Sequence, residues 1–199
     1  LLKFQIIFAL INYEINIDRA SKEFSLLAQA TFDTSLKIAE SRIIKKYKID
    51  NLSYSIVAYG RFATLSMTAN SDLDLVFIYD SKNSNNNSEQ KIYIELFRQL
   101  IRTLSSKTTE GFMYEVDTKL RPSGKEGPVV CTYDNFKKYH QENSFCWEKL
   151  ALKKTRIINE NNFNAKTSKL LEKLKKINIS DKDIAYEILM MRTNVNQAQ

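Results

Sequence analysis

The feature of this sequence best suited to chemistry is a pair of aspartates two residues apart. Asp72 and Asp74 lie in the segment S-D-L-D-L, and the residues that follow are strongly apolar. Because side chains alternate between the two faces of a strand, this spacing places both carboxylates on one face, with their α-carbons roughly 6–7 Å apart. Two carboxylates on a largely buried strand repel each other and lose solvation, and a divalent cation removes that cost. Hard oxygen ligands favour Mg²⁺.

A third carboxylate follows on the next predicted strand. Asp117 lies in Y-E-V-D-T-K-L-R, within residues 112–120, which we predict to be extended. If this strand pairs beside the first, Asp117 completes a D-x-D…D cluster that can hold two metal ions about 3.5–4 Å apart. A bare D-x-D is a weak signal, because acidic pairs are common at strand ends. Ser71, Arg121 and the loop opened by Gly60 strengthen it.

The elements that must position these residues follow from the placement of glycine and proline. All four glycines and both prolines fall between residues 60 and 128, and both flanks read as helix. Apolar residues at helical spacing predict helices over 3–14 and 18–48, the second with a stripe of core residues. That stripe is Phe32, Leu36, Ala39, Ile43 and Tyr47.

The middle of the chain changes to strand periodicity. We predict strands over 53–59, 73–79 and 112–120, and helices over 89–106, 133–155 and 168–192. Polar low-complexity residues 81–88 and Pro/Gly-rich residues 122–130 predict loops. The order indicates an α/β (α+β) fold, with a small mixed sheet flanked by helices and helical extensions at both ends.

Composition narrows the class of protein further. The chain has 199 residues and a net charge of +7, and this positive charge suggests nucleic acid as a partner. Its lysines are spread along the chain, however, and solvated helix faces explain them better than a basic binding face. The two cysteines lie outside any CxxC pattern and fit a reducing cytoplasm. The apolar run of residues 4–11 is too short for a membrane span.

Three blocks of sequence resemble one known family. Residues 58–79 (A-Y-G-R-F-A-T-L-S-M-T-A-N-S-D-L-D-L-V-F-I-Y) resemble the signature of glutamine synthetase adenylyltransferase, of the DNA polymerase β-like nucleotidyltransferase superfamily. Residues 114–129 are similar to its second signature and residues 139–156 to its helical W-E…A-L…R segment. The resemblance spans essentially the whole chain. It implies a helical lead-in over 1–50, a nucleotidyltransferase domain over 51–160 and the start of a C-terminal helical region over 161–199. We expect a fragment of a longer protein.

The resemblance implies residue roles. Asp72, Asp74 and Asp117 would bind two Mg²⁺ ions, and Asp117 would also help to deprotonate an incoming tyrosine. Gly60 and Ser71 would approach the phosphates of ATP. Arg121 would either pair with phosphate or form a structural salt bridge. Trp147, Glu148 and His140 are interpreted as a core aromatic, a helix-surface acid and a structural histidine.

The family carries two catalytic halves, one attaching AMP to a tyrosine of glutamine synthetase and one removing it by phosphorolysis. The motifs Pro122–Gly124 and Ala151–Leu152 resemble the C-terminal, attaching half. The resemblance therefore implies Mg²⁺-dependent transfer of AMP from ATP to glutamine synthetase, which regulates nitrogen assimilation. It also implies a PII-type signalling protein as a partner, through other parts of the full-length protein. The removing half, a non-catalytic fragment and a nucleic-acid-directed transferase are the alternatives.

The sequence departs from the family in the phosphate loop. The family has G-K-L-G-G followed by a basic and an acidic residue, whereas this chain has G-R-F-A-T-L-S from Gly60 to Ser66. The glycine pair has become Ala63–Thr64, and a β-branched threonine resists positive φ. We therefore expect strain of about 1–3 kcal/mol there, or a rearranged loop.

Overall fold

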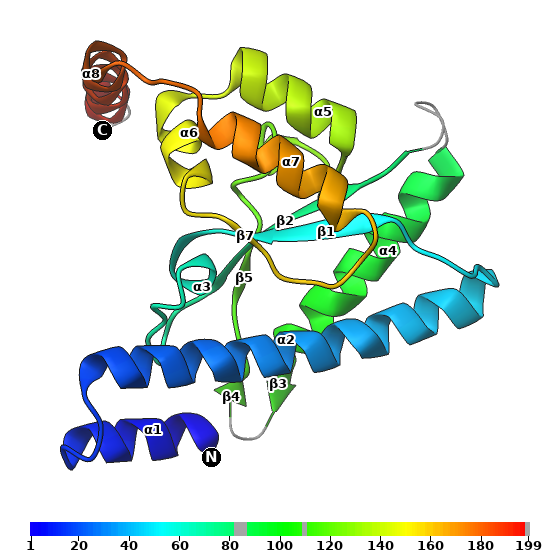
Figure 1. Ribbon diagram of the computed structural model, residues 1–199, viewed down its shortest axis with the longest axis vertical. Coiled ribbons are helices and arrows are strands. Elements are labelled where there is room, and N and C mark those ends of the chain that lie inside the picture. Colours follow the sequence, from blue (N-terminus) through cyan, green and yellow to red (C-terminus); the bar gives the residue numbers. More distant parts are fainter. Residues whose placement is uncertain (82–86, 109–110, 198–199) are drawn as a thin grey trace.

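The computed structural model describes residues 1–81, 87–108 and 111–197. It shows a small mixed sheet with helices on both faces, which confirms the predicted fold class (Figure 1). The helices are α1 (Leu2–Ile11), α2 (Ile17–Tyr47), α3 (Gly60–Ala63), α4 (Asn87–Leu104), α5 (Tyr133–Lys138), α6 (Cys146–Leu152), α7 (Asn164–Lys175) and α8 (Asp181–Gln197). A 3-10 turn, η1 (Gly124–Glu126), and a π-helical turn, η2 (Tyr139–Asn143), complete them.

The sheet is built around β2 (Leu73–Tyr79). β1 (Tyr54–Ala58) lies antiparallel along one side of it, and β7 (Arg156–Ile157) lies antiparallel to β1. The other side of β2 pairs in parallel with β5 (Val116–Asp117) near its start and with β6 (Val130–Thr132) near its end. A separate hairpin joins β3 (Lys107–Thr108) to β4 (Gly111–Phe112). None of the helices, over the residues described, is long and apolar enough to cross a membrane.

Alternation along β2 divides the interior into two cores. Leu73, Leu75 and Phe77 pack with the buried faces of α2 and α4, whereas Val76 and Ile78 pack with α5, α6 and α7. Strand geometry requires this division, because successive side chains point to opposite faces. Asp72 and Asp74 therefore share the face of Val76 and Ile78, at the opposite end of the strand.

The long helix α2 covers one side of the core that contains Leu73, Leu75 and Phe77. Asn16 caps it by accepting a hydrogen bond from the Arg19 amide at 2.9 Å, and the chain leaves it at Lys48 in the left-handed conformation. The predicted stripe is confirmed, with all its members buried except Tyr47, which is half-buried. Lys3 connects α1 to the two segments that lead into β2 and β5, because its ammonium donates to the carbonyls of Ala69 and Met113 at 3.2 and 2.9 Å.

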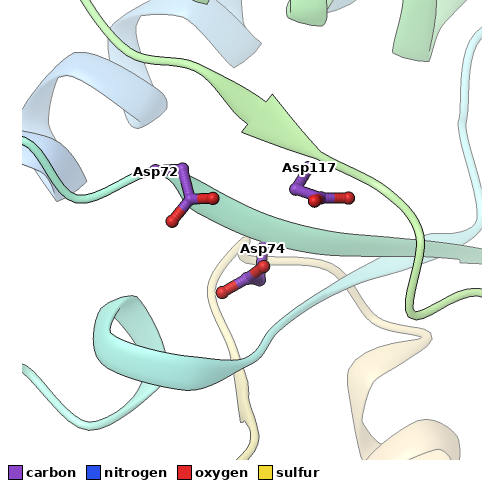
Figure 2. A group of neighbouring side chains, drawn as sticks. All are labelled: Asp72, Asp74 and Asp117. Atoms are coloured by element: carbon purple, nitrogen blue, oxygen red, sulfur yellow. The ribbon is translucent and has the colours of Figure 1, made fainter. Parts of the chain in front are cut away.

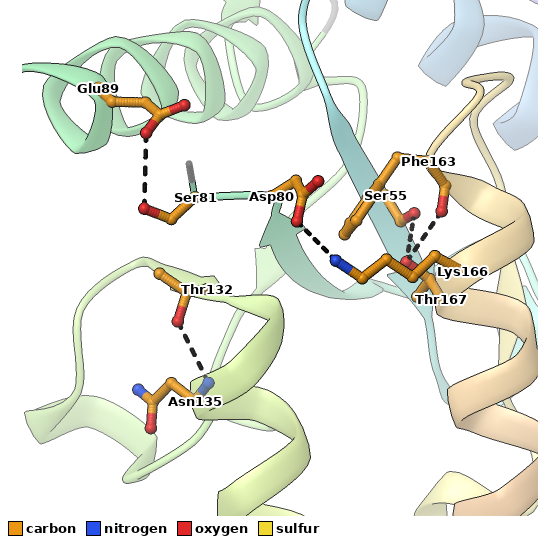
Figure 3. A network of polar contacts seen from close by, with 9 residues as sticks. All are labelled: Ser55, Asp80, Ser81, Glu89, Thr132, Asn135, Phe163, Lys166 and Thr167. Atoms are coloured by element: carbon orange, nitrogen blue, oxygen red, sulfur yellow. Dashed lines mark hydrogen bonds and ion pairs between the residues drawn. The ribbon is translucent and has the colours of Figure 1, made fainter. Parts of the chain in front are cut away.

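Polar contacts hold α7 against the sheet (Figure 3). The buried hydroxyl of Ser55 on β1 donates to Thr167 at 2.9 Å, and Thr167 in turn donates to the Phe163 carbonyl at 3.4 Å. An ion pair of 2.9 Å joins Lys166 to Asp80 at the end of β2. That pair is solvent-exposed and contributes at most about 1 kcal/mol. The buried hydroxyls, and the apolar packing of α7 in the core that contains Val76 and Ile78, therefore do most to fix α7 in place.

Two predicted elements are interrupted. The strand predicted over 112–120 pairs with β2 only at Val116–Asp117, because the Asp117 carboxylate accepts a hydrogen bond from the Lys119 amide at 2.8 Å and turns the chain. The helix predicted over 133–155 breaks at Ser144–Phe145. There Glu148 accepts a hydrogen bond from the Phe145 amide at 2.9 Å and begins a new helix.

Three smaller differences complete the comparison with the sequence. The predicted helix over 168–192 is split between α7 and α8, where Ser180 accepts from the Asp183 amide at 3.2 Å. The connection over 60–71 contains α3, and the loop over 122–130 contains η1. The low-complexity loop predicted over 81–88 lies largely outside the described residues, and α4 begins at Asn87.

Candidate active site

Three carboxylates converge at the start of β2. Asp72 precedes the strand, Asp74 lies on it, and Asp117 stands directly opposite Asp74 on the parallel strand β5. One carboxylate oxygen from each lies within 4.8 Å of the others (Figure 2). The sequence predicts this grouping, and the register of β2 with β5 produces it. The ligand set is purely carboxylate oxygen, which suits a hard divalent cation.

The electrostatics of the cluster leave Asp74 in an unfavourable environment. Burial, together with the charges of Asp72 and Asp117, raises the pKa of Asp74 to about 6. Among the residues described, no hydrogen-bond donor reaches the carboxylate of Asp72 or of Asp74. A carboxylate that is half-buried, without a donor and next to like charges is stabilised by a bound cation.

Asp117 differs because a lysine neutralises it. The Lys119 ammonium lies 2.6 Å from Asp117 Oδ2, and the Lys119 amide donates to Oδ1 at 2.8 Å. Burial raises the pKa of Asp117, but the hydrogen bonds and charge of Lys119 outweigh it, so this pKa lies below its usual value. Lys119 thus neutralises part of the negative charge of the cluster. Strand periodicity could not reveal this pairing, because β5 ends at Asp117 and the chain turns before Lys119.

Gly60 adjoins the cluster from the first position of α3, just after β1. Its φ is +57°, and a β-carbon at this position would lie 2.6 Å from Asp74 Oδ2. Both the conformation and the space therefore require glycine. The sequence predicts a functional glycine here, and the structure adds that it makes room for a site carboxylate.

The strain expected at Ala63–Thr64 lies elsewhere. Ala63 ends α3, and Thr64 has φ −91°, so neither adopts the left-handed conformation. The left-handed residue is Leu65, with φ +56°. The strain expected at threonine is not found there, because the left-handed conformation falls one residue later, at partly exposed Leu65.

Replacing Leu65 with glycine should raise the free energy of unfolding by about 0.5–1 kcal/mol, because glycine adopts positive φ without the Cβ penalty. Leu65→Ala is the control: it removes the same side chain but keeps the β-carbon. Chemical denaturation of the three proteins measures the effect. A gain in Leu65→Ala equal to that in Leu65→Gly would contradict the conformational explanation.

Ser71 and Arg121 lie beside the cluster in different settings. The Ser71 hydroxyl accepts from the Thr68 amide at 2.9 Å and shapes the turn before Asp72. The Arg121 guanidinium is buried and donates to Thr118, Lys125 and Gly127 at 2.8–3.2 Å, so it organises the loop around η1. No ion pair to Arg121 occurs within the part of the chain that is described. Its role toward phosphate stays a prediction.

A cavity of about 480 Å³ opens on the Asp72–Asp117 side of the cluster. Its charged lining consists of three acidic side chains, Asp72, Glu115 and Asp117, and three basic ones, Lys119, Arg121 and Lys125. Sequence reasoning missed Glu115, Lys119 and Lys125. Glu115 lies just before β5 and the two lysines lie in the loop after it, and the fold brings them to one cavity.

Of three residues interpreted in the later helices, Trp147 and Glu148 lie differently from that interpretation, and His140 agrees with it. Trp147 is 41% exposed, so it is not a core aromatic, and Glu148 is only 5% exposed, so it is not a surface acid. Glu148 is buried because it caps α6 and accepts hydrogen bonds from the Tyr139 hydroxyl at 3.0 Å. His140 is buried against Phe136, and burial lowers its pKa to about 4. A neutral buried imidazole agrees with a structural role.

One aspartate lies just before the central strand of a mixed sheet, a second lies on it, and a third lies on its parallel neighbour, an arrangement consistent with a nucleotidyltransferase-like α/β fold. Comparison with known families specifies the class further. Residues 2–170 match the family described as glutamate-ammonia ligase adenylyltransferase, and the chain belongs to that family.

Curated relatives carry the name bifunctional glutamine synthetase adenylyltransferase/adenylyl-removing enzyme. The protein of Brucella melitensis biotype 1 is 35% identical over 164 residues, which are 78% of this chain and 17% of that protein. The protein of Psychromonas ingrahamii is 30% identical over 161 residues, covering 74% of this chain and 17% of the relative. One from Rhodopseudomonas palustris is 28% identical over 192 residues, with 92% of this chain and 19% of the relative. The chain thus spans under a fifth of the length of these relatives.

Proposed function

We propose that this chain is the catalytic nucleotidyltransferase part of an enzyme that transfers AMP from ATP to a tyrosine of glutamine synthetase. The observation that carries the proposal is the convergence of Asp72, Asp74 and Asp117 from two adjacent strands. Family membership supports the reaction, and the names of the relatives support glutamine synthetase as the substrate.

Asp72, Asp74 and Asp117 would hold Mg²⁺, and the donor-free, half-buried carboxylate of Asp74 fits that cation. When bound, Mg²⁺ polarises phosphoryl oxygens and lowers the pKa of a coordinated hydroxyl. Asp72 and Asp74 fix the position of the nucleotide relative to the strand. Asp117 helps to remove the proton of the incoming tyrosine hydroxyl.

The phosphates of the nucleotide would lie between α3 and the loop around η1. Gly60 places the chain in contact with Asp74 and leaves no side chain in the way. Ser71 shapes the turn that carries Asp72, and Arg121 holds the loop that carries Lys125. We assign the three residues to the phosphate side of the site on these positions.

The wider assignments extend the same proposal. The motifs Pro122–Gly124 and Ala151–Leu152 favour the adenylyl-attaching half over the phosphorolytic half. The helical lead-in would cover residues 1–50, the nucleotidyltransferase domain residues 51–160, and the start of a helical region residues 161–199. Regulation of nitrogen assimilation in the cytoplasm, with a PII-type protein acting through other parts of the enzyme, follows from the family.

The test is to incubate the full-length enzyme that contains this chain with glutamine synthetase, Mg²⁺ and ATP labelled at the α-phosphate. We expect label on a tyrosine of glutamine synthetase, and none when Asp72 is replaced by asparagine. Formation of ADP from adenylylated glutamine synthetase and inorganic phosphate, abolished by the same replacement, would instead assign the removing half.

A non-catalytic role is the second candidate, and the altered loop favours it. Leu65 holds a left-handed backbone where the family has a basic residue, and the glycine pair is absent. Absence of both activities in the full-length enzyme, together with retained binding of glutamine synthetase, would establish this alternative.

A further inference from the structure

We propose that Lys119 exchanges partners during the reaction: its ammonium occupies Asp117 in the metal-free protein and passes to a phosphate oxygen of the nucleotide when Mg²⁺ binds. The inference rests on the proposed function and adds a residue to it. It concerns a side chain that none of the sequence motifs assigns to the chemistry.

The first step is the competition for Asp117. Both oxygens of this carboxylate are engaged by Lys119, through the amide at 2.8 Å and the ammonium at 2.6 Å. Asp72 and Asp74 have no such partner in the part of the chain that is described. A dication that coordinates Asp117 would therefore meet a like charge at hydrogen-bond distance, and the ammonium must leave.

The second step is the freedom of the ammonium to move. The Lys119 side chain is 60% exposed, so its rotation disturbs little packing. It lines the 480 Å³ cavity together with Arg121 and Lys125. Most of the N–H groups of Arg121 are already used on backbone and hydroxyl oxygens of its own loop. Lys119 and Lys125 are therefore the basic groups in the cavity with donors to offer.

The third step is the charge balance of that cavity. Its three carboxylates and three basic groups balance one another in the metal-free protein. A dication bound to the aspartates makes the same lining net positive, and the released ammonium then faces the hollow. Ammonium groups bind phosphate oxygens through strong, charge-assisted hydrogen bonds. The cavity thus becomes suited to a polyphosphate only after the metal has arrived.

The test measures two affinities that should change in opposite directions in Lys119→Met. Mn²⁺ is the metal probe, followed by electron paramagnetic resonance on this chain, and inorganic pyrophosphate is the phosphate probe, followed by calorimetry at saturating Mn²⁺. We expect Mn²⁺ to bind roughly three- to tenfold more tightly, because the competing charge is gone. We expect pyrophosphate to bind roughly tenfold more weakly, because a charge-assisted hydrogen bond is lost.

Lys46→Met is the matched control. Lys46 forms an ion pair of 2.7 Å with Glu95 between α2 and α4, away from this cavity, so the same charge is removed without either effect. Unchanged or weaker Mn²⁺ binding in Lys119→Met would overturn the competition, and unchanged pyrophosphate binding would overturn the transfer to phosphate. If Mn²⁺ binds equally well when Asp74 is replaced by asparagine, the metal site itself fails and the inference falls with it.

Discussion

Replacing Asp74 with asparagine is expected to lower the proposed AMP transfer, measured on the full-length enzyme, roughly a hundred- to a thousandfold. The same replacement should make the metal-free chain more stable above pH 6. The two effects have one cause. Asp74 sits half-buried between Asp72 and Asp117, where its negative charge is useful to a bound cation and unfavourable without one.

The sign of the stability change follows from the pKa of Asp74, which is raised from 3.8 to about 6 in the folded chain. At about pH 3 and below, the carboxyl is mostly protonated in both the folded and the unfolded states and has little net effect. As the pH rises toward 6 and beyond, the folded state must carry a charge that the unfolded chain carries more easily. Allowing for solvent screening, the gain in Asp74→Asn should be about 1–2 kcal/mol at pH 8 and close to zero at about pH 3.

Chemical denaturation at the two pH values, in the presence of chelator, measures this gain. Asp80→Asn is the control, because it removes an equal charge from the far end of β2, where Asp80 pairs with exposed Lys166. It should lower stability slightly and leave transfer unchanged. Added Mg²⁺ should reverse the order of stability, since only the wild-type site gains from binding it. A loss of stability at pH 8 in Asp74→Asn would contradict the electrostatic explanation.

Replacing Gly60 with alanine should lower the free energy of unfolding by about 2–4 kcal/mol and weaken Mg²⁺ binding. Left-handed backbone accounts for about 1–2 kcal/mol of this. The remainder comes from the new β-carbon, which would lie 2.6 Å from Asp74 Oδ2 and must push the carboxylate aside.

The chain offers a matched control for Gly60. Gly124 has a φ of +54°, close to the +57° of Gly60, but the nearest atom to its β-carbon position would be the Lys119 carbonyl at 3.6 Å. Gly124→Ala should therefore show only the conformational loss. Combining Gly60→Ala with Asp74→Ala should reduce the penalty at Gly60 to that at Gly124, because the clashing oxygen is gone. Equal losses in the two single variants would show that contact with Asp74 is unimportant.

The local sequence determined the parts of this protein that follow from backbone periodicity. The strand 73–79, the apolar stripe of α2 and the common face of Asp72 and Asp74 are all confirmed, because alternation every two or every 3.6 residues is a property of the chain itself. The presence of a third carboxylate could also be predicted from Asp117 and its apolar neighbours.

Only the tertiary structure decided how these pieces combine into a site. The parallel register of β5 with β2 places Asp117 opposite Asp74, and it depends on packing between segments more than forty residues apart. The pairing of Lys119 with Asp117, the burial of Glu148 and the left-handed backbone at Leu65 arise where the chain turns or breaks. Hydrogen bonds and packing override local propensity at such points, and a periodic pattern carries no information about them.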